Sequence, residues 1–289
     1  MEELVYLNGK LLLSSQAWLS PFDHGFLYGY GLFETMRAYS GKVFRLSRHI
    51  DRLKSSAAFM GLTEKLAHYD LARAVTDTIQ ANHLTDARIR LTVSAGPGDV
   101  VPAPDRCSEP TVFIIARPYT PLSAKVYERG FQACLSSFRR DSSSPLSRLK
   151  SCNYLLSVLA RREAKLAGAD EALLLNEKGE LTEGSTSNLF IVSGGVVLTP
   201  PLESGILPGI ARETTLEIAS SLMMKVEERR LVPGQLCRAD EAFLTNSLLE
   251  IVPLTIVDDK PVGSGHPGPL TRKLMSAYKD LVRTETRPF

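Results

Sequence analysis

The side chain best suited to covalent chemistry is the lysine of the stretch SRLKSCNYL, Lys150. A serine- and proline-rich loop over 139–149 precedes it, and a predicted amphipathic helix over 153–167 follows it. Most lysines are solvated surface charges. A lysine amine becomes a nucleophile when burial or a neighbouring cation keeps part of it deprotonated. Taken alone, the stretch leaves both interpretations of Lys150 open.

A carboxylate and a helix start further along the chain would suit a reactive lysine. Glu183 stands at the end of a predicted strand, before Gly-Ser-Thr-Ser, where it could pair with a protonated ring nitrogen. Pro208-Gly209 turns the chain into a predicted helix. The backbone N–H groups of Ile210 and Ala211 at its start form a candidate anion site, although proline before a helix is common.

Two further features could bind a phosphate. Arg52, in HIDRL, offers a planar guanidinium that suits phosphate oxygens, although a surface ion pair is the commoner role. Asn246 and Ser247 interrupt two apolar predicted strands, and they could hydrogen-bond a phosphate or a substrate, or simply form a turn. We assign no catalytic role to His49. A lysine, an acid for a ring nitrogen and an anion cradle are together the groups that a pyridoxal phosphate enzyme requires.

The elements that must position these residues are mostly short strands. Asn8-Gly9 and Ser40-Gly41 each separate two apolar runs, the pattern of a tight hairpin. Strands outnumber helices in both halves, so we predict an α+β fold with much antiparallel sheet. Helices are predicted from a cap at Ser47 to Met60, over 67–83, over 153–167 with Gly168 as the terminating glycine, from Ile210 to about 223, and over 268–285.

The length of 289 residues predicts about two domains. Pro118 and Pro121 break regular structure in the stretch YTPLSAKVYERG, which we interpret as a connector. We therefore predict a small N-terminal α/β domain over 1–118. A larger C-terminal domain over 119–289, with mixed and antiparallel sheet, would carry Lys150.

Composition excludes several classes of protein. The net charge of +2 comes without a long basic run, so we expect no nucleic-acid partner and no membrane partner. The four cysteines are widely spaced, with no histidine cluster near them, so we expect no metal site and no disulfide framework. No apolar run reaches about 18 residues, and the N-terminus does not read as a signal peptide. A cytoplasmic location is the default expectation.

Three stretches together resemble one enzyme family. RLKSCNYL, TEGSTSNLF and GILPGIAR, in this order and at these separations, resemble the fold type IV pyridoxal phosphate enzymes. That family includes branched-chain aminotransferases, D-amino-acid aminotransferases and aminodeoxychorismate lyases. The resemblance extends over nearly the whole chain, from SPFDHGFLYGYGLFETMR to TNSLLEIVPLT. It implies a small and a larger domain, with the cofactor between them, in a homodimer.

The resemblance also implies a role for each candidate residue. Lys150 would bind the cofactor covalently and move protons, and Glu183 would pair with the pyridine nitrogen. Tyr154 would hydrogen-bond the ring hydroxyl, although some relatives have a lysine-to-tyrosine spacing one residue longer. The phosphate would be held by Arg52, the Ile210 and Ala211 amides and Ser247, with Asn246 beside them, and the substrate pocket would include Tyr28, Phe33 and Arg37.

The residue after Phe33-Glu34 bears on the reaction. Thr35 occupies a position that is typically glycine in branched-chain enzymes and threonine in aminodeoxychorismate lyases. We therefore expect a lyase that converts aminodeoxychorismate to 4-aminobenzoate and pyruvate, for folate synthesis, with Thr35 or Lys150 supplying a proton. The alternative is a branched-chain aminotransferase with 2-oxoglutarate as acceptor. The loop SAGPGDVVPAP has no arginine before Arg106, which argues against a D-amino-acid enzyme.

Overall fold

The first sheet of the computed structural model, which describes residues 2–107 and 109–287, grows from two tight hairpins. The turns at Asn8-Gly9 and Ser40-Gly41 have φ values of 47°, 89°, 49° and 80°. Positive φ at both turn residues matches the twist of the flanking strands. The turns join β1 (Leu4–Leu7) to β2 (Lys10–Leu13) and β3 (Gly31–Tyr39) to β4 (Lys42–Val43). Both predicted hairpins are confirmed.

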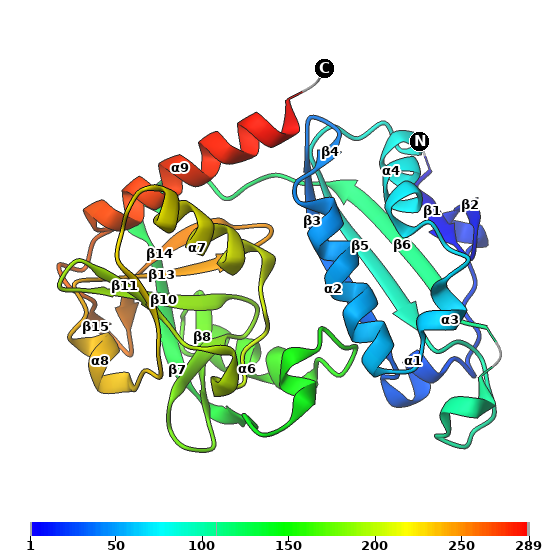
Figure 1. Cartoon of the computed structure of the whole chain (residues 1–289), viewed down its shortest axis with the longest axis horizontal. Coiled ribbons are helices and arrows are strands. Elements are labelled where there is room, and N and C mark those ends of the chain that lie inside the picture. The colour runs from blue at the N-terminus through cyan, green and yellow to red at the C-terminus, as the bar shows by residue number, and fades with distance from the viewer. Residues whose placement is uncertain (1, 108, 288–289) are drawn as a thin grey trace. The chain divides into compact units, whose positions relative to one another are not determined.

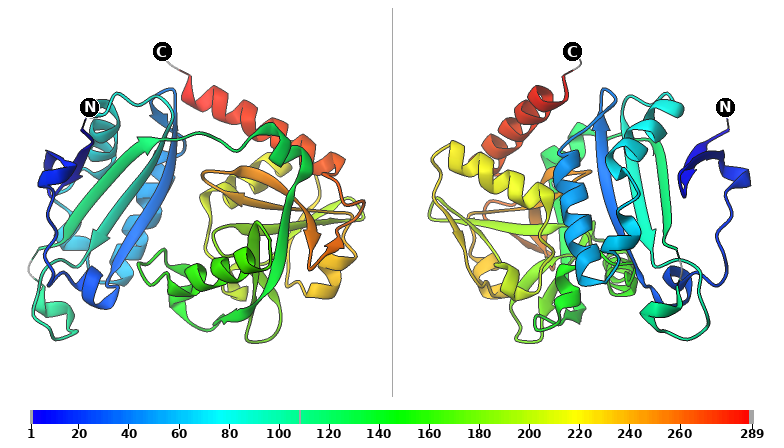
Figure 2. Two further views of the ribbon diagram at one scale, coloured as in Figure 1. Left: turned by 180° about the vertical axis from the view of Figure 1, so that it is seen from behind. Right: turned by 45° about the vertical axis from the view of Figure 1, so that its right-hand side comes forward.

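Two long strands complete this antiparallel sheet, β5 (Ala87–Ser94) and β6 (Thr111–Pro118), in the order β2-β1-β6-β5-β3-β4. The helices α2 (Leu46–Phe59) and α4 (Leu71–Ala81) pack on one face of it (Figures 1 and 2). Their buried side chains share one apolar core with alternate residues of the strands. The other residues of each strand point to the opposite face, because side chains alternate along a strand.

Two helix predictions needed correction at their starts. Ser47 does not cap α2; its N-cap is Arg45, in the left-handed conformation with φ 56° and without a side-chain cap. The helix predicted over 67–83 begins only at Leu71, because the Asp70 carboxylate accepts a hydrogen bond from Arg73 N at 3.0 Å and starts the helix there. Shorter segments are α1 (His24–Tyr28), α3 (Thr63–Leu66), η1 (Ser14–Gln16) and η2 (Pro104–Arg106).

The second sheet has its strands in the order β12-β11-β10-β13-β14-β7-β8-β9, with β15 paired to β14. Because β9 also pairs with β10, the strands β10, β13, β14, β7, β8 and β9 close into a ring around an apolar core. The sequence did not predict this closure. The strands are β7 (Phe131–Arg140), β8 (Glu171–Asn176), β9 (Leu181–Gly184), β10 (Asn188–Ser193), β11 (Val196–Thr199), β12 (Val226–Glu228), β13 (Glu241–Asn246), β14 (Glu250–Val257) and β15 (Lys260–Pro261).

The helices of the second half follow the prediction closely. Gly168 has φ 71° and terminates α6 (Leu155–Leu166) as predicted. The predicted connector contains a helix, α5 (Ala124–Arg129), which starts after the prolines. The others are η3 (Pro145–Arg148), η4 (Leu202–Ser204), α7 (Ile210–Ser221), α8 (Pro233–Cys237) and α9 (Pro269–Thr286). Sheets and helices in both halves confirm the α+β class.

The chain divides into two units. Unit 1 comprises Met1–Thr120, Leu149–Asn153 and Val282–Phe289, and unit 2 comprises Pro121–Arg148 and Tyr154–Leu281. We predicted Lys150 in the C-terminal domain, but its segment belongs to unit 1. The reason is backbone pairing, because Ser151 forms a β-bridge with Leu32 of β3.

Candidate active site

Backbone hydrogen bonds fix Lys150 at the edge of β3. The Lys150 carbonyl accepts from Phe33 N at 2.9 Å, and Cys152 N donates to the Gly31 carbonyl at 2.8 Å. Gly31 has no room for a side chain, since a Cβ there would lie 2.9 Å from the Val93 carbonyl oxygen and 3.1 Å from Cys152 Sγ. The Lys150 Nζ atom lies 4.6 Å from the centroid of the Phe33 ring. The half-buried amine is therefore positioned by a strand edge rather than by a loop alone.

The face of the first sheet opposite α2 and α4 carries polar and cationic side chains; we call it the polar face. Thr35 lies directly across from Arg90, and Arg37 directly across from Arg88. The Arg90 guanidinium carbon is 3.8 Å from the Phe33 ring centroid, so this ring contacts two cationic side chains. The polar face includes Phe33, Thr35, Arg37, Arg88, Arg90, Thr92 and Arg117, together with the apolar side chains of Phe113 and Ile115 on β6.

The three predicted pocket residues of unit 1 lie in different settings. Phe33 is buried beneath Lys150 and Arg90. Arg37 is also buried, and its guanidinium stacks on the rings of Tyr39 and Tyr119, at 4.2 and 4.8 Å. Tyr28, at the end of α1, is exposed and donates its hydroxyl hydrogen to the Val100 carbonyl.

On the helix side of β3, Arg52 belongs to a buried charged cluster. Its Nε and Nη2 atoms donate to the two carboxylate oxygens of Glu34, at 2.8 and 2.5 Å. His49 Nδ1 lies 2.7 Å from Glu34 Oε2. Sequence reasoning missed Glu34 as the partner of Arg52 and His49, because the three residues come from two separate elements. The arginine proposed to hold a phosphate is thus fixed in orientation by a carboxylate.

Burial and charge set the protonation of this cluster. Burial alone would raise the pKa of Glu34, but the charge of Arg52 and the hydrogen bonds from His49 and Arg52 lower it from 4.5 to about 2. For His49, burial lowers the pKa below its ordinary 6.5. The charges of Arg52 and Lys150 lower this pKa further, whereas the hydrogen bond and the charge of Glu34 raise it. Near neutral pH, the cluster therefore contains an ionised glutamate, a neutral histidine and a cationic arginine.

In unit 2, Glu183 is a buried carboxylate held on both oxygens. Arg140 Nη1 lies 2.8 Å from Oε1. Asn188 Nδ2 and Leu207 N donate to Oε2, at 2.9 and 3.0 Å. Arg140 also donates to the Gly205 and Ser147 carbonyls, so its own orientation is fixed. An ionised carboxylate held this way suits a protonated ring nitrogen.

Asn188 connects Glu183 to the start of α7. Its Nδ2 also donates to the Leu207 carbonyl at 3.0 Å. A Cβ at Gly209, the N-cap of α7, would collide with Asn188 Oδ1, so only glycine fits there. Ile210 and Ala211 are buried in the first turn, where backbone N–H groups have no partner within the helix. The structure therefore brings the predicted anion site and Glu183 into one network.

A second buried carboxylate shapes the loop that follows Glu183. Glu171 accepts hydrogen bonds from Ser185 N and the hydroxyls of Ser185, Thr186 and Ser187. Asn246 Nδ2 donates to the Thr186 carbonyl at 3.2 Å, which joins the Asn246-Ser247 turn to the same loop. The sequence did not single out Glu171, because one acidic residue at the start of an apolar strand carries no distinctive pattern.

Tyr154 lies beside this loop. Its hydroxyl lies 3.5 Å from the Ser185 carbonyl oxygen. Burial raises the pKa of Tyr154, and the charge of Glu183 raises it further. Within unit 2, Tyr154, Glu183, the start of α7 and the turn at Asn246-Ser247 therefore belong to one hydrogen-bonded neighbourhood. Lys150, Thr35, Phe33 and Arg37 lie in unit 1, as does Arg52 on the helix side of β3.

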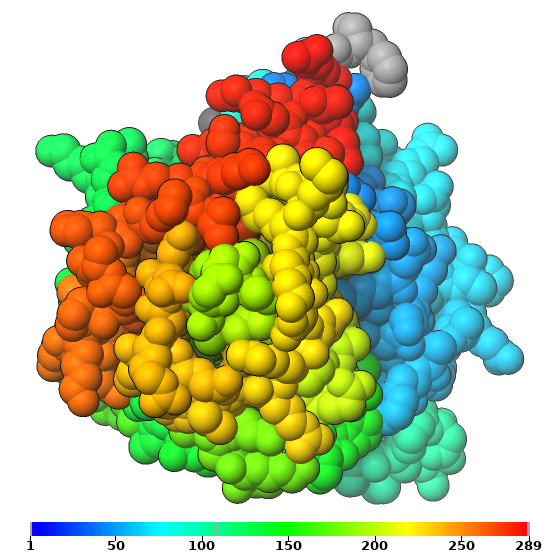
Figure 3. All heavy atoms as spheres, turned by 60° about the vertical axis from the view of Figure 1, so that its left-hand side comes forward, coloured from blue at the N-terminus to red at the C-terminus, as the bar shows by residue number. Residues whose placement is uncertain are grey.

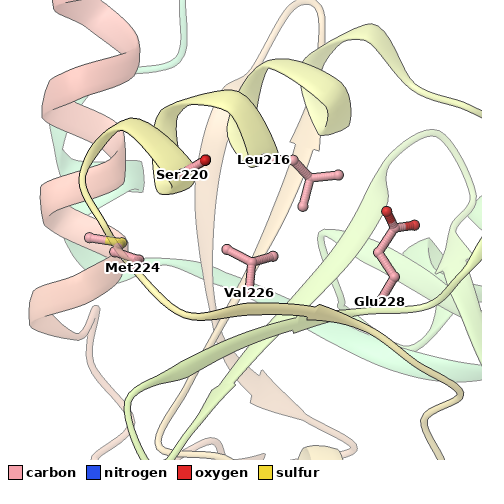
Figure 4. A pocket seen from close by; sticks show the side chains of 5 residues that line it. All are labelled: Leu216, Ser220, Met224, Val226 and Glu228. Atoms are coloured by element: carbon pink, nitrogen blue, oxygen red, sulfur yellow. The ribbon is translucent and has the colours of Figure 1, made fainter.

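The surface between α7 and β12 contains a cavity of about 470 Å³, lined by Leu216, Ser220, Met224, Val226 and Glu228. Figure 3 shows the yellow α7 on the surface of unit 2, and Figure 4 shows the lining side chains. None of the predicted site residues lines it. Among the described residues, no group of three or more His, Cys, Asp or Glu could hold a metal ion, and no helix is long and apolar enough to cross a membrane.

Known proteins match the whole chain. The family described as Amino-transferase class IV matches residues 31–257. A putative branched-chain-amino-acid aminotransferase of Methanocaldococcus jannaschii is 42% identical over 280 residues, 96% of each chain. The aminodeoxychorismate lyase of Bacillus subtilis is 34% identical over 282 residues, 97% of this chain and 95% of the relative.

Solved structures agree. The branched-chain amino acid aminotransferase of Escherichia coli has a TM-score of 0.93 at 32% identity, covering 99% of this chain and 97% of that one. A second branched-chain amino acid aminotransferase, solved with pyridoxamine 5′-phosphate, has a TM-score of 0.91 at 31% identity, covering 100% of this chain and 96% of that one.

The side chains fit the cofactor of these relatives. A strand-held lysine, an ionised glutamate paired with an arginine, and a helix start without a side-chain cap are the donors and acceptors that it needs. With the match over residues 31–257, they identify the protein as a member of the class IV aminotransferase family, which uses pyridoxal phosphate.

Proposed function

We propose that the protein is an aminotransferase that acts on branched-chain amino acids and passes their amino group to 2-oxoglutarate. The observation that carries this proposal is the likeness, over 96% of the chain, to a relative named a putative branched-chain-amino-acid aminotransferase, at 42% identity. The comparisons support this activity better than the lyase expected from Thr35. Fold and cofactor do not fix the reaction, so an assay has to decide.

When bound, pyridoxal phosphate supplies a carbonyl carbon for amino groups and a ring that withdraws electrons. Lys150 would hold the cofactor at that carbon through Nζ, and as a free amine it would take the proton from the α-carbon of the substrate. Glu183 holds the ring nitrogen protonated, and Arg140, 2.8 Å away, keeps Glu183 ionised. Tyr154 donates to the ring hydroxyl.

In this proposal the phosphate is held by backbone N–H groups, by a serine and an asparagine side chain, and by one arginine. Ile210 and Ala211 contribute backbone N–H groups at the positive end of the α7 dipole. Ser247 and Asn246 lie in the turn tied to the loop after Glu183. Arg52, fixed by Glu34, contributes its charge. Phe33 and Arg37 line the substrate side with Tyr28.

The proposal makes Lys150 indispensable. Lys150→Ala should lower turnover by at least about three orders of magnitude, because no other amine replaces it at the β3 edge. After borohydride treatment, mass spectrometry should find the cofactor attached to the native chain and absent from the variant. Lys165→Ala, on the exposed end of α6, is the control and should stay labelled and active.

The activity itself is tested with leucine and 2-oxoglutarate. Glutamate formation supports the aminotransferase. Release of 4-aminobenzoate from chorismate in the presence of an amidating enzyme, without glutamate formation from leucine, would show that the protein is a lyase and not an aminotransferase.

One observation favours the lyase as second candidate. The Thr35 side chain is on the polar face with Phe33, which Lys150 contacts, so the Thr35 hydroxyl could supply a proton. Thr35→Val should then abolish only the lyase activity.

We also propose a homodimer in a cytoplasmic setting. The segment around α1 exposes large apolar side chains, among them Trp18 at 82% and Phe26 at 79%. Asp23 anchors this segment by accepting from the Ser94 and Thr111 hydroxyls, at 2.9 and 2.6 Å. A fixed apolar surface of this kind suits a second copy of the chain, and analytical ultracentrifugation tests whether the protein is a dimer.

All four cysteines are free, which suits the reducing compartment that we propose.

A further inference from the structure

We propose that Glu171 is a positioning residue for the cofactor, which acts by fixing the turn between Glu183 and Asn188. The inference rests on the proposed function, because that function assigns Glu183 to the ring nitrogen and Asn246 to the phosphate. It adds a residue that acts only through these others. Glu171 is the first residue of β8, and it is 1% exposed.

The turn in question consists of residues 184–187 and joins β9 to β10; we call it the serine turn. Glu183, before it, lies directly across from Asn188, after it. Gly184 N donates to the Ser187 carbonyl at 2.7 Å, which closes the turn. Asn188 Nδ2 donates to Glu183 Oε2 at 2.9 Å, so both partners of this hydrogen bond adjoin the turn. The conformation of the serine turn therefore sets the position of the Glu183 carboxylate.

Every hydroxyl of the serine turn donates to Glu171. Ser185 donates to Oε1 from its hydroxyl and, at 3.2 Å, from its backbone nitrogen. Thr186 and Ser187 donate to Oε2 from their hydroxyls, at 3.3 and 3.0 Å. Within residues 2–107 and 109–287, the one other donor is the adjacent Ala172 N, and no cation forms an ion pair with Glu171. The hydrogen bonds of this buried carboxylate thus converge on one turn.

Packing also joins the serine turn to Glu171. A Cβ at Gly184 would lie 2.2 Å from Ser187 Oγ and 3.1 Å from Glu171 Cγ and Cδ, so the contact has no room for a methyl group. Ser185 and Ser187 are buried, and buried hydroxyls that lose their acceptor are costly to leave unsatisfied. The turn keeps this conformation because the carboxylate satisfies it.

The backbone of the serine turn borders two other residues assigned to the cofactor. The Thr186 carbonyl accepts from Asn246 Nδ2 at 3.2 Å, and the Ser185 carbonyl oxygen lies 3.5 Å from the Tyr154 hydroxyl. The side chains of the turn therefore bind Glu171, while its carbonyls contact Tyr154 and Asn246. A displaced turn would disturb the proposed contacts to the ring nitrogen, the ring hydroxyl and the phosphate together.

The test measures the bound cofactor rather than turnover. Glu171→Gln replaces one acceptor oxygen by a donor, so it should weaken binding of pyridoxal phosphate by about tenfold or more in a fluorescence titration of the apoprotein. With cofactor isotopically labelled at the ring nitrogen, the NMR resonance of that nitrogen should move toward the unprotonated form. An acid that only stabilised the fold would lower the unfolding temperature and change neither measurement.

A matched control lies in α6. Glu163 accepts from the Ser136 hydroxyl at 2.6 Å and from Ser137 N at 3.1 Å, but these donors belong to β7. Glu163→Gln should therefore leave the affinity and the resonance at native values.

A milder variant tests the same contact with the carboxylate in place. Ser185→Ala should change both measurements in the same direction as Glu171→Gln, by less. The double variant should bind the cofactor about as Glu171→Gln does, because both substitutions remove one shared hydrogen bond. Losses that simply add would show that the two residues act separately, and the inference would fail.

Two outcomes distinguish this inference from the proposed function. Native affinity and a native ring-nitrogen resonance in both Glu171→Gln and Ser185→Ala would show that Glu171 positions nothing at the cofactor. If Glu183→Gln leaves the resonance unchanged, the role proposed for Glu183 is wrong and the inference falls with it. If the native protein forms no glutamate from leucine while Glu171→Gln still alters the bound cofactor, the proposed activity fails and the inference stands.

Discussion

Glu34 and Arg52 illustrate how one residue determines the role of another. The sequence presents Arg52 as a candidate phosphate ligand, and the structure pairs its guanidinium with a buried carboxylate. A lone arginine on a helix would sample many rotamers and lose that freedom on binding an anion. An arginine that Glu34 already fixes has lost this rotamer freedom during folding, so binding a phosphate costs it less entropy.

The same cluster predicts how stability depends on pH. The folded-state pKa of His49 is below 6.5, so the unfolded chain binds more protons and stability falls as the pH drops below 6.5. Glu34, with a folded-state pKa of about 2 against 4.5, loses its stabilisation of about 3 kcal/mol between pH 4.5 and 2. The free energy of unfolding, measured in urea at a series of pH values, should therefore fall in two pH ranges, one below 6.5 and one between 4.5 and 2.

Substitutions separate the two contributions. His49→Gln should flatten the stability curve as the pH falls from 6.5, and Glu34→Gln should flatten it below pH 4.5. His68→Gln, at an exposed position, is the control and should leave both regions unchanged. A curve that keeps its native shape in His49→Gln would show that another group titrates there.

Arg140 provides the counter-charge to Glu183. Their side chains are 13% and 7% exposed, so removing Arg140 leaves a carboxylate with little water around it. Arg140→Met should lower the free energy of unfolding by about 3 kcal/mol and raise the pH at which the bound cofactor changes its absorption spectrum. Arg139→Met, at the neighbouring exposed position, should do neither.

At the scale of elements, the turn before α7 has to keep a glycine. The Asn188 side chain packs against Gly209 with its Oδ1 atom and donates to Glu183 with its Nδ2 atom. Gly209→Ala should therefore push Asn188 away, weaken cofactor binding by about tenfold or more and slow turnover. Fluorescence titration of the apoprotein with pyridoxal phosphate measures the affinity.

A matched glycine is available in α8. A Cβ at Gly234 would meet its nearest neighbours at 3.5 Å or more, an ordinary contact, so Gly234→Ala should bind the cofactor normally. Equal affinities in the two variants would contradict the role given to Asn188.

For the whole molecule, local patterns predicted most elements, and long-range pairings escaped prediction. Asn8-Gly9 and Ser40-Gly41 predicted their hairpins because their backbone requirement is local. Glu34 and Glu171 could not be predicted as hubs, because their partners come from other elements. The closure of β9 onto β10 depends on a pairing that no single stretch specifies. Lys150 and Glu183 were proposed together as site residues because a family pattern, rather than local physics, links them.

The segment Leu149–Asn153 belongs to unit 1 although the chain before and after it belongs to unit 2. Its docking edge, β3, is made about a hundred residues earlier during synthesis. Since domains fold from the N-terminus as the chain emerges from the ribosome, the edge can be in place before the lysine appears. A circular permutant that begins at residue 121 would reverse this order, so during cell-free synthesis its activity should lag further behind completion of the chain than that of the native protein does.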